Sequence, residues 1–177
     1  HIEGDDPNGV RVVSRPGDWT GVAISFRRSD FGKAAKLPEL AAAGVYLLWS
    51  TNPEIKVYVG QSGNVGERLK SHHTNKDFWT HAVAFTAPYG TLNTGHIEWL
   101  ENELYEHFRQ TTSFKLENQQ STKKSMMSRA DKGSAGEFLQ RITQTMPFAG
   151  FHLLENDADT ASDETLSTTF NDDTIIV

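Results

Sequence analysis

Two extended segments joined by a proline turn constrain the fold of this chain more than any other feature. Residues 44–50 (GVYLLWS) and 55–60 (IKVYVG) are rich in β-branched and aromatic residues, the types that strands favour. Pro53 in the short connection restricts the residue before it to an extended conformation. We therefore predict a well-buried antiparallel hairpin.

Three other segments have the composition of strands. They are bounded by turn residues, and they comprise residues 10–13, 21–26 and 78–87. Residues 29–43 are expected to form a loop or a broken helix, because Pro38 limits the length of any regular helix there.

Helical patterns follow the hairpin. A short helix is expected after Gly63, with Asn64 as its N-cap and Glu67 completing a capping box. Residues 94–110 give the clearest helical period, with Thr94 as the predicted cap. Their apolar face is formed by Ile97, Leu100, Leu104 and Phe108. A second amphipathic helix is expected at residues 135–146, ended by Pro147.

The composition narrows the class of protein. The 177 residues can hold one ordinary domain, and 37% hydrophobic with 23% charged residues suits a soluble globular protein. The absence of cysteine excludes disulfides and thiolate-bound metals and suits a cytoplasmic location. The longest apolar run is interrupted at Gly44 and is too short to span a bilayer, so we expect no membrane association.

The acidic charge is concentrated at one end of the chain. Residues 155–177 contain seven Asp and Glu residues and no Lys or Arg, and their low hydrophobic content predicts a disordered tail. The remaining residues carry 17 basic and 16 acidic side chains, a formal charge of +1. Strong nucleic-acid binding by bulk charge is therefore not expected.

Each strand of the hairpin places a tyrosine near a glycine. Because side chains alternate along a strand, Tyr46 shares a face with Gly44, and Tyr58 shares a face with Gly60. A lone strand tyrosine usually fills a half-buried position and no more. Two of them, each beside a glycine, indicate a place where backbone or a ligand comes close.

Two basic side chains and a carboxylate could join the tyrosines. Arg68 and His72 are four residues apart on a predicted helix and lie on one side of it. Surface charge explains each alone, but an arginine at a buried margin also resembles a phosphate clamp. Glu101 falls about 40° from Ile97, at the margin of the apolar face. There it needs a partner, either a bound cation or Arg68.

Taken in order, these residues resemble the motifs of one nuclease family. The segments GVY (44–46), YVG (58–60), GERLKSH (66–72) and WLENEL (99–104), with Asn118 in KLENQQ, look like a GIY-YIG nuclease domain. Each short motif is weak alone, whereas the ordered set is specific. The match covers roughly residues 40–120, and valine replaces isoleucine in both halves, which preserves strand preference.

The resemblance implies an α/β fold of the α+β type, with a small, mostly antiparallel central sheet flanked by helices. Residues 1–39 would form an N-terminal extension with short strands, and residues 40–120 the nuclease domain. Residues 121–154 would form a basic loop and a C-terminal helix, followed by the acidic tail at 155–177. The flanking segments also resemble bacterial proteins with a further C-terminal module, which is expected to be missing here.

The resemblance also implies hydrolysis of nucleic-acid phosphodiester bonds, with DNA favoured, and dependence on one Mg²⁺ or Mn²⁺ ion. Tyr46 would help to deprotonate the attacking water with His72 as its hydrogen-bonding partner, although Tyr46 and Tyr58 could exchange roles. Tyr58 would position the phosphate or the water. Arg68 would neutralise the phosphate oxygens, and Glu101 would hold the metal.

Further residues would serve the substrate. Gly60 would let a phosphate approach, and Asn118 would organise the site or contact the substrate. Lys123 and Lys124 would help to hold the nucleic-acid backbone. His73 and His81 are alternatives for the site histidine, so the choice of His72 rests on motif spacing.

Two other interpretations stay open. The domain could be a catalytically silent nucleic-acid-binding or regulatory module, although such a module would not need the carboxylate of Glu101. It could also be a soluble interaction domain in which Arg68 and Glu101 form a structural ion pair. In the nuclease interpretation, target choice is expected to come from the missing module or a partner protein. The sequence is silent on oligomeric state.

Overall fold

A computed structural model gives the fold of the chain and describes residues 2–3, 9–15, 17–111, 113–119 and 125–151. The predicted tail at 155–177 and the residues Lys123 and Lys124 lie outside this part of the chain. No helix among the described residues has the length and apolar character that crossing a bilayer requires.

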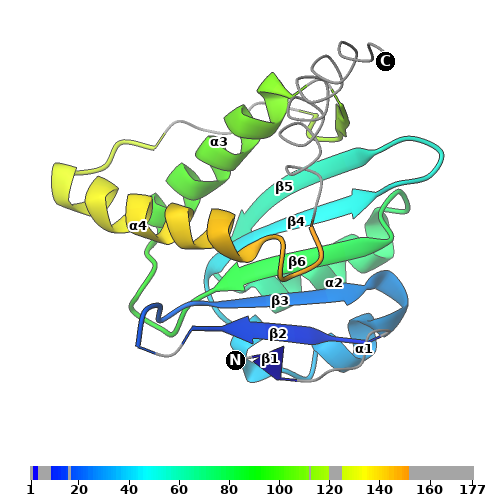
Figure 1. Ribbon diagram of the computed structural model, residues 1–177, viewed down its shortest axis with the longest axis horizontal. Coiled ribbons are helices and arrows are strands. Elements are labelled where there is room, and N and C mark those ends of the chain that lie inside the picture. The colour runs from blue at the N-terminus through cyan, green and yellow to red at the C-terminus, as the bar shows by residue number, and fades with distance from the viewer. Residues whose placement is uncertain (1, 4–8, 16, 112, 120–124, 152–177) are drawn as a thin grey trace, which may run out of the picture.

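A seven-stranded sheet forms the centre of the fold, in the order β1-β2-β3-β6-β4-β5-β7 (Figure 1). Its strands are β1 (Ile2–Glu3), β2 (Arg11–Ser14), β3 (Val22–Arg27), β4 (Gly44–Ser50), β5 (Lys56–Ser62), β6 (His81–Thr86) and β7 (Lys115–Leu116). All neighbouring pairs are antiparallel except β5 and β7. The predicted α+β class with a mostly antiparallel sheet is therefore confirmed.

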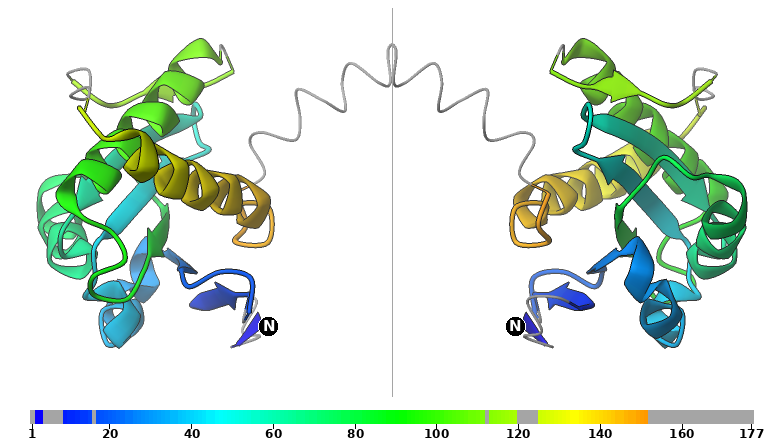
Figure 2. Two further views of the ribbon diagram at one scale, coloured as in Figure 1. Left: turned by 90° about the vertical axis from the view of Figure 1, so that its left-hand side faces the viewer. Right: turned by 90° about the vertical axis from the view of Figure 1, so that its right-hand side faces the viewer.

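Helices cover both faces of this sheet. They are α1 (Phe31–Ala34), α2 (Val65–Asn75), α3 (Thr94–Gln110) and α4 (Arg129–Thr145). Two 3₁₀ turns at Arg28–Asp30 and Pro38–Leu40 complete the broken helical segment expected there. In Figure 1, α4 crosses in front of the sheet and α2 lies behind it, and the side views in Figure 2 show the same layers.

Two apolar cores lie on the opposite faces of the sheet. On one face, Val45, Leu47 and Trp49 of β4 pack in a cluster with Leu104 of α3 and Ile142 of α4. On the other, alternate residues of β4 join a cluster from α1, α2 and the segments beside them; its members include Tyr46, Leu48, Phe31, Val65, Leu69 and Trp79. Tyr46 therefore belongs to the face that α2 covers.

The predicted hairpin is confirmed, and its register places glycine against tyrosine. In the antiparallel β4–β5 pair, Tyr46 lies opposite Gly60 and Leu48 lies opposite Tyr58. β5 continues to Ser62 and turns directly into α2, whose first residue is Val65. This short connection brings the side chains of α2 back over the two tyrosine-bearing strands.

The starts of α3 and α4 and the capping box of α2 differ from the sequence predictions. Asn93, and not Thr94, caps α3, because its side chain accepts from the His96 N–H while the His96 ring accepts from the Asn93 N–H. Asn64 is confirmed as the cap of α2, because its side chain accepts from the Glu67 N–H. The predicted capping box is not formed, since the Asn64 N–H donates to the Ser62 hydroxyl and not to the Glu67 side chain. α4 begins at Arg129, six residues early, because Ser128 caps an exposed first turn without apolar periodicity.

Candidate active site

The Tyr46 ring occupies the space that Gly60 leaves open across the hairpin. Tyr46 is completely buried, and a Cβ added at Gly60 would overlap its hydroxyl and ring carbons. Gly44, at the start of the same strand, has no side chain because a Cβ there would overlap the Phe85 carbonyl. The group that comes close to Gly60 in the structure is thus the Tyr46 side chain. The approach of a phosphate to Gly60 stays a prediction.

Replacing Gly60 with alanine is expected to lower the free energy of unfolding by about 1–3 kcal/mol, because the Tyr46 ring must leave its position. Gly63→Ala is the matched control, since a Cβ at Gly63 meets no atom within 4 Å. We expect that control to change the stability by less than about 0.5 kcal/mol. Urea denaturation measures both variants, and equal stabilities would contradict this account of Gly60.

The Tyr46 hydroxyl is hydrogen-bonded to His72, the buried histidine of α2. The distance from Tyr46 Oη to His72 Nε2 is 2.7 Å. Burial lowers the pKa of His72 to about 4, with the positive charges of Lys76 and Arg68 acting in the same direction. His72 is therefore neutral at physiological pH, with one ring nitrogen able to accept a proton.

Tyr58 and Arg68 complete the polar side of this group. The Tyr58 ring is half-buried, with its centroid 6.3 Å from that of Tyr46 and 5.3 Å from that of His72. The exposed side chain of Arg68 lies beside both hydroxyls. Burial raises the pKa of each tyrosine above its ordinary value, and Arg68 opposes that rise. Both hydroxyls are therefore protonated in the metal-free protein.

Glu101 of α3 lies within electrostatic range of the same group, and it is half-buried, as the helical wheel predicts for a residue at the margin of the apolar face. Its carboxylate acts electrostatically on both Tyr46 and Tyr58. Burial raises the pKa of Glu101 to about 7, the charge of Glu98 adds to the rise, and Arg68 opposes it. The side chain is half-buried.

The Glu101 carboxylate is not paired with Arg68. Within the described part of the chain, no ion pair joins it to Arg68, so the structural ion pair considered from the sequence is not formed. The same residues contain no cluster of three or more His, Asp or Glu side chains that would cage a metal. One half-buried carboxylate without a counter-ion fits Mg²⁺, which keeps most of its waters and needs few protein ligands.

Asn118 is fixed to the strand that carries Tyr58 and Gly60. Its side-chain oxygen accepts from the Val59 N–H at 3.0 Å, and its side-chain nitrogen donates to the Val59 carbonyl at 2.8 Å. These bonds extend the pairing between β7 and β5. In the same pairing, the Glu117 N–H donates a hydrogen bond to the Val57 carbonyl. Of the two roles expected for Asn118, organising the site matches this geometry.

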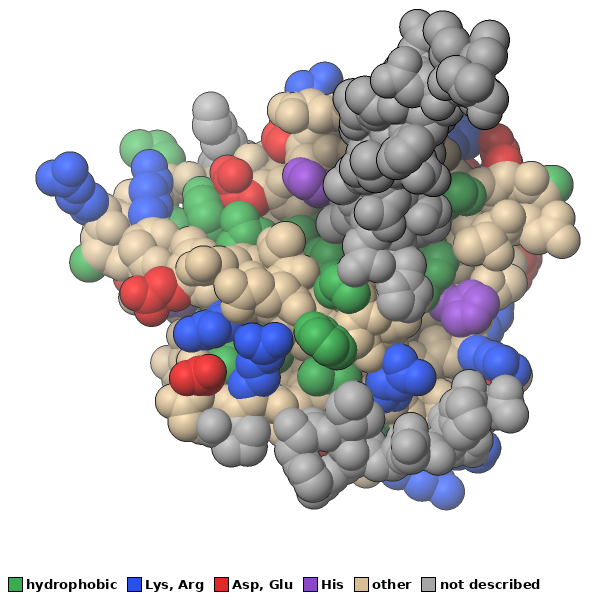
Figure 3. Space-filling model, viewed as in Figure 1, with side chains coloured by type: hydrophobic (Ala, Val, Ile, Leu, Met, Phe, Trp, Pro, Cys, Tyr) green, Lys and Arg blue, Asp and Glu red, His purple; other side chains and the backbone are tan. Residues whose placement is uncertain are grey.

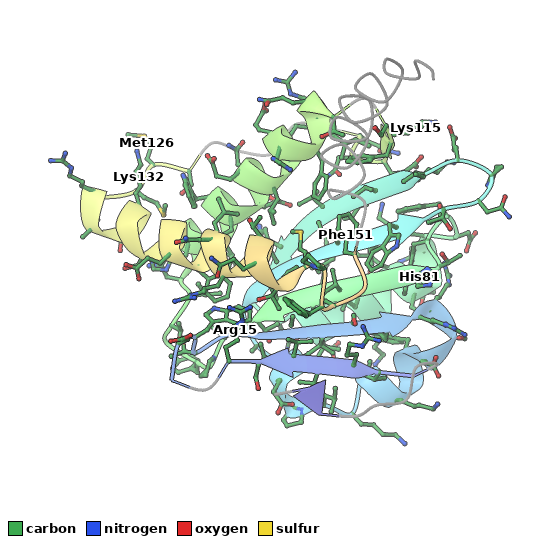
Figure 4. The ribbon with its side chains drawn as sticks, viewed as in Figure 1. Arg15, His81, Lys115, Met126, Lys132 and Phe151 are labelled. Atoms are coloured by element: carbon green, nitrogen blue, oxygen red, sulfur yellow. The ribbon has the colours of Figure 1, made fainter. Side chains whose placement is uncertain are left out.

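The two alternative histidines lie elsewhere. The exposed His73 stacks on Phe31 with centroids 5.0 Å apart. His81 stacks on Trp49 at 5.5 Å, on the face of the sheet that carries Phe151 (Figure 4). Only His72 among the three is hydrogen-bonded to a site tyrosine in the described residues.

One cation beside the site was missed from the sequence. The ammonium group of Lys76 lies 4.5 Å from the centroid of the Tyr58 ring. Lys76 follows His72 by four residues, as His72 follows Arg68. That repeated spacing, which places side chains on one ridge of a helix, could have indicated it.

An α+β domain that gathers two tyrosines, a histidine, an arginine and a carboxylate has the side chains that a phosphodiester-cleaving enzyme requires. Residues 42–126 match the family model described as the GIY-YIG catalytic domain. The resemblance to the GIY-YIG family, a family of nucleases, is therefore confirmed for these residues. Neither the curated proteins nor the solved structures gave a match.

Proposed function

We propose that this protein is a metal-dependent endonuclease that hydrolyses phosphodiester bonds in nucleic acid, with DNA as the favoured substrate. The observation that carries the proposal is the hydrogen-bonded Tyr46–His72 pair beside Arg68, with the Glu101 carboxylate acting electrostatically on the hydroxyls of Tyr46 and Tyr58. Hydrolysis builds negative charge on the phosphate oxygens, and an arginine aimed there stabilises the transition state.

Arg68 would exchange its tyrosine contacts for the scissile phosphate. Its guanidinium is exposed and lies beside the buried Tyr46 hydroxyl. A phosphate is a stronger partner for arginine than a neutral hydroxyl, because the hydrogen bonds are charge-assisted and bidentate. Turning Arg68 toward the phosphate would uncover the Tyr46 hydroxyl and allow water to reach it.

The proton of the attacking water would then pass through Tyr46 to His72. Tyr46 Oη would accept a proton from water as its own proton moves to His72 Nε2. The resulting hydroxide would attack phosphorus, and the bond from phosphorus to the leaving oxygen would break. The low pKa of His72 opposes this transfer in the free protein, partly through Lys76 and Arg68. A bound phosphate neutralises these cations, so substrate binding would raise the pKa of His72 and favour the transfer.

Glu101 is the residue that would hold the metal, one Mg²⁺ or Mn²⁺ ion. The ion would supply charge stabilisation at the phosphate and leaving oxygens. Without it, the Glu101 carboxylate is half-buried beside Glu98 and forms no salt bridge with a cation of the described residues. Tyr58, which is more exposed than Tyr46, would position the phosphate or the water.

Target choice would rest on a further module or a partner protein. Figure 3 shows acidic and basic side chains interspersed on the described part of the face that carries α4. The formal charge of +1 outside residues 155–177 gives little nonspecific attraction to a polyanion. Cleavage of one duplex sequence with high selectivity at physiological salt by this chain alone would contradict this part of the proposal.

A nicking assay on single- and double-stranded DNA and RNA tests the activity. The parent protein is expected to cut when Mg²⁺ or Mn²⁺ is present and to stop when a chelator removes it. Glu101→Ala and Arg68→Ala are each expected to reduce the rate by roughly 10²–10³-fold, as removal of one transition-state contact does elsewhere. Equal activity in all three preparations would identify a contaminant and overturn the proposal.

A further inference from the structure

Three side chains of α2 and its C-terminal cap follow one ridge beside β5. Arg68, His72 and Lys76 are spaced four residues apart, and His72 is buried between the two cations. Eight residues of helix place the Arg68 and Lys76 backbones about 12 Å apart. Their charged groups come closer together than the backbones, because Arg68 lies beside the Tyr58 hydroxyl and the Lys76 ammonium lies 4.5 Å from the centroid of the Tyr58 ring.

Lys76 is a cation without an anionic partner among the described residues. Its ammonium lies over the Tyr58 ring, and the side chain is half-buried. Other lysines near the sheet edges have carboxylates close by: Lys56 lies 3.5 Å from Glu54 and 3.6 Å from Glu117. The cation–π contact leaves the charge of this ammonium unpaired with any anion of the described residues, so a phosphate can still form a charge-assisted hydrogen bond with it.

The end of α2 is anchored so that Lys76 keeps this position. The Lys76 N–H donates to the His72 carbonyl, and its own carbonyl accepts from the Arg28 guanidinium. Arg28 also donates to the His73 carbonyl at 2.8 Å and lies 4.9 Å from the centroid of the Trp79 ring. The Arg28 guanidinium is therefore held by contacts within the fold, whereas the Lys76 ammonium points toward the Tyr58 ring.

We propose that Lys76 binds a phosphate flanking the scissile one, so that the substrate strand runs along α2 from Arg68 to Lys76. This inference rests on the proposed nuclease function and adds the path of the substrate to it. Lys76 covers a face of the Tyr58 ring, which makes that face unsuitable for base stacking. Recognition along this ridge is therefore of the backbone, without a preference for base sequence.

Single-turnover cleavage of the substrate that the nicking assay identifies tests this path. Lys76→Gln is expected to raise the half-saturating protein concentration roughly tenfold. The slope of the logarithm of that concentration against the logarithm of the salt concentration should decrease by about one. The maximal rate of this variant should fall by no more than about threefold, because Lys76 would not contact the scissile bond and its charge lowers the pKa of His72, which opposes the proton transfer. Lys76→Arg, which keeps the charge, should restore most of the affinity.

Lys70→Gln is the matched control, because Lys70 is exposed on α2 and lies two residues, about 200°, from Arg68. We expect it to change the half-saturating concentration by less than about twofold. If Lys76→Gln behaved like Lys70→Gln, or lowered the maximal rate alone, the substrate path would be wrong and the nuclease proposal would stand. If the parent cut no nucleic acid, both would fall.

Discussion

Glutamine in place of Glu101 is expected to reduce metal-dependent cleavage strongly. In the metal-free protein, the same substitution is expected to stabilise the fold above pH 7. The first effect, a loss of roughly 10²–10³-fold, follows from removing the charge proposed to hold the metal. The second follows from the setting of the carboxylate, which is half-buried beside Glu98 and unpaired with Arg68. Loss of activity together with a gain in stability is typical of a residue selected for function.

The pH dependence of that gain has a defined sign. The pKa of Glu101 rises from 4.5 to about 7 on folding, so the folded protein binds more protons than the unfolded chain between these values. Ionisation of Glu101 therefore destabilises the fold progressively as the pH rises from 4.5, and the cost is complete above pH 7. Because the side chain is only half-buried, solvent screening reduces the full cost to about 1–2 kcal/mol. Glu101→Gln should thus match the parent near pH 4 and exceed its stability by up to that amount at pH 8.

Urea denaturation in a chelating buffer at the two pH values measures this difference. Glu103→Gln is the matched control, because Glu103 is on the same helix and lines a cavity facing α4 residues such as Leu139. It should leave cleavage and its metal dependence unchanged. A Glu101→Gln protein less stable than the parent at pH 8 would mean that the carboxylate has a stabilising partner in the fold.

Phenylalanine in place of Tyr46 is expected to slow cleavage by roughly 10²–10⁴-fold, the range typical of a lost acid–base group. The substitution keeps the ring that fills the space at Gly60 but removes the partner of His72 Nε2. A buried nitrogen left without its hydrogen bond costs about 1–3 kcal/mol of unfolding free energy. Both effects should therefore appear, and substrate affinity should change little.

Tyr58→Phe and Tyr89→Phe separate the possible outcomes. Tyr89 is fully exposed, so its substitution should leave both rate and stability at the parent values. Tyr58 is not a partner in the hydrogen bond between Tyr46 and His72, so its substitution should cost less stability than that of Tyr46. If Tyr58→Phe lost the activity while Tyr46→Phe kept it, the two tyrosines would have exchanged the proposed roles.

The sequence predicts this site well where the determinants are local. The alternation of β4 and β5, the Asn64 cap and the four-residue spacing of Arg68 and His72 each lie within a few residues, and all are present in the structure. The margin position of Glu101 is also a helical-wheel property. These features depend on backbone periodicity, which a sequence displays directly.

What the sequence could not supply depends on contacts between distant segments. Asn118 binds the backbone of Val59, 59 residues away, and no local pattern indicates that partner. Gly60 faces Tyr46 through the strand register, so the close approach it permits was expected to be with a phosphate. The start of α4 depends on the Ser128 cap of an exposed turn, where apolar periodicity gives no signal.

Anomalous X-ray diffraction from crystals grown with Mn²⁺ tests the central claim most directly, because it locates the cation without relying on activity. The predicted result is one Mn²⁺ ion on the Glu101 carboxylate, on the side that faces the Tyr46 and Tyr58 hydroxyls and Arg68. A Glu101 carboxylate that holds no Mn²⁺ and instead closes onto Arg68 would contradict the proposed metal-dependent site.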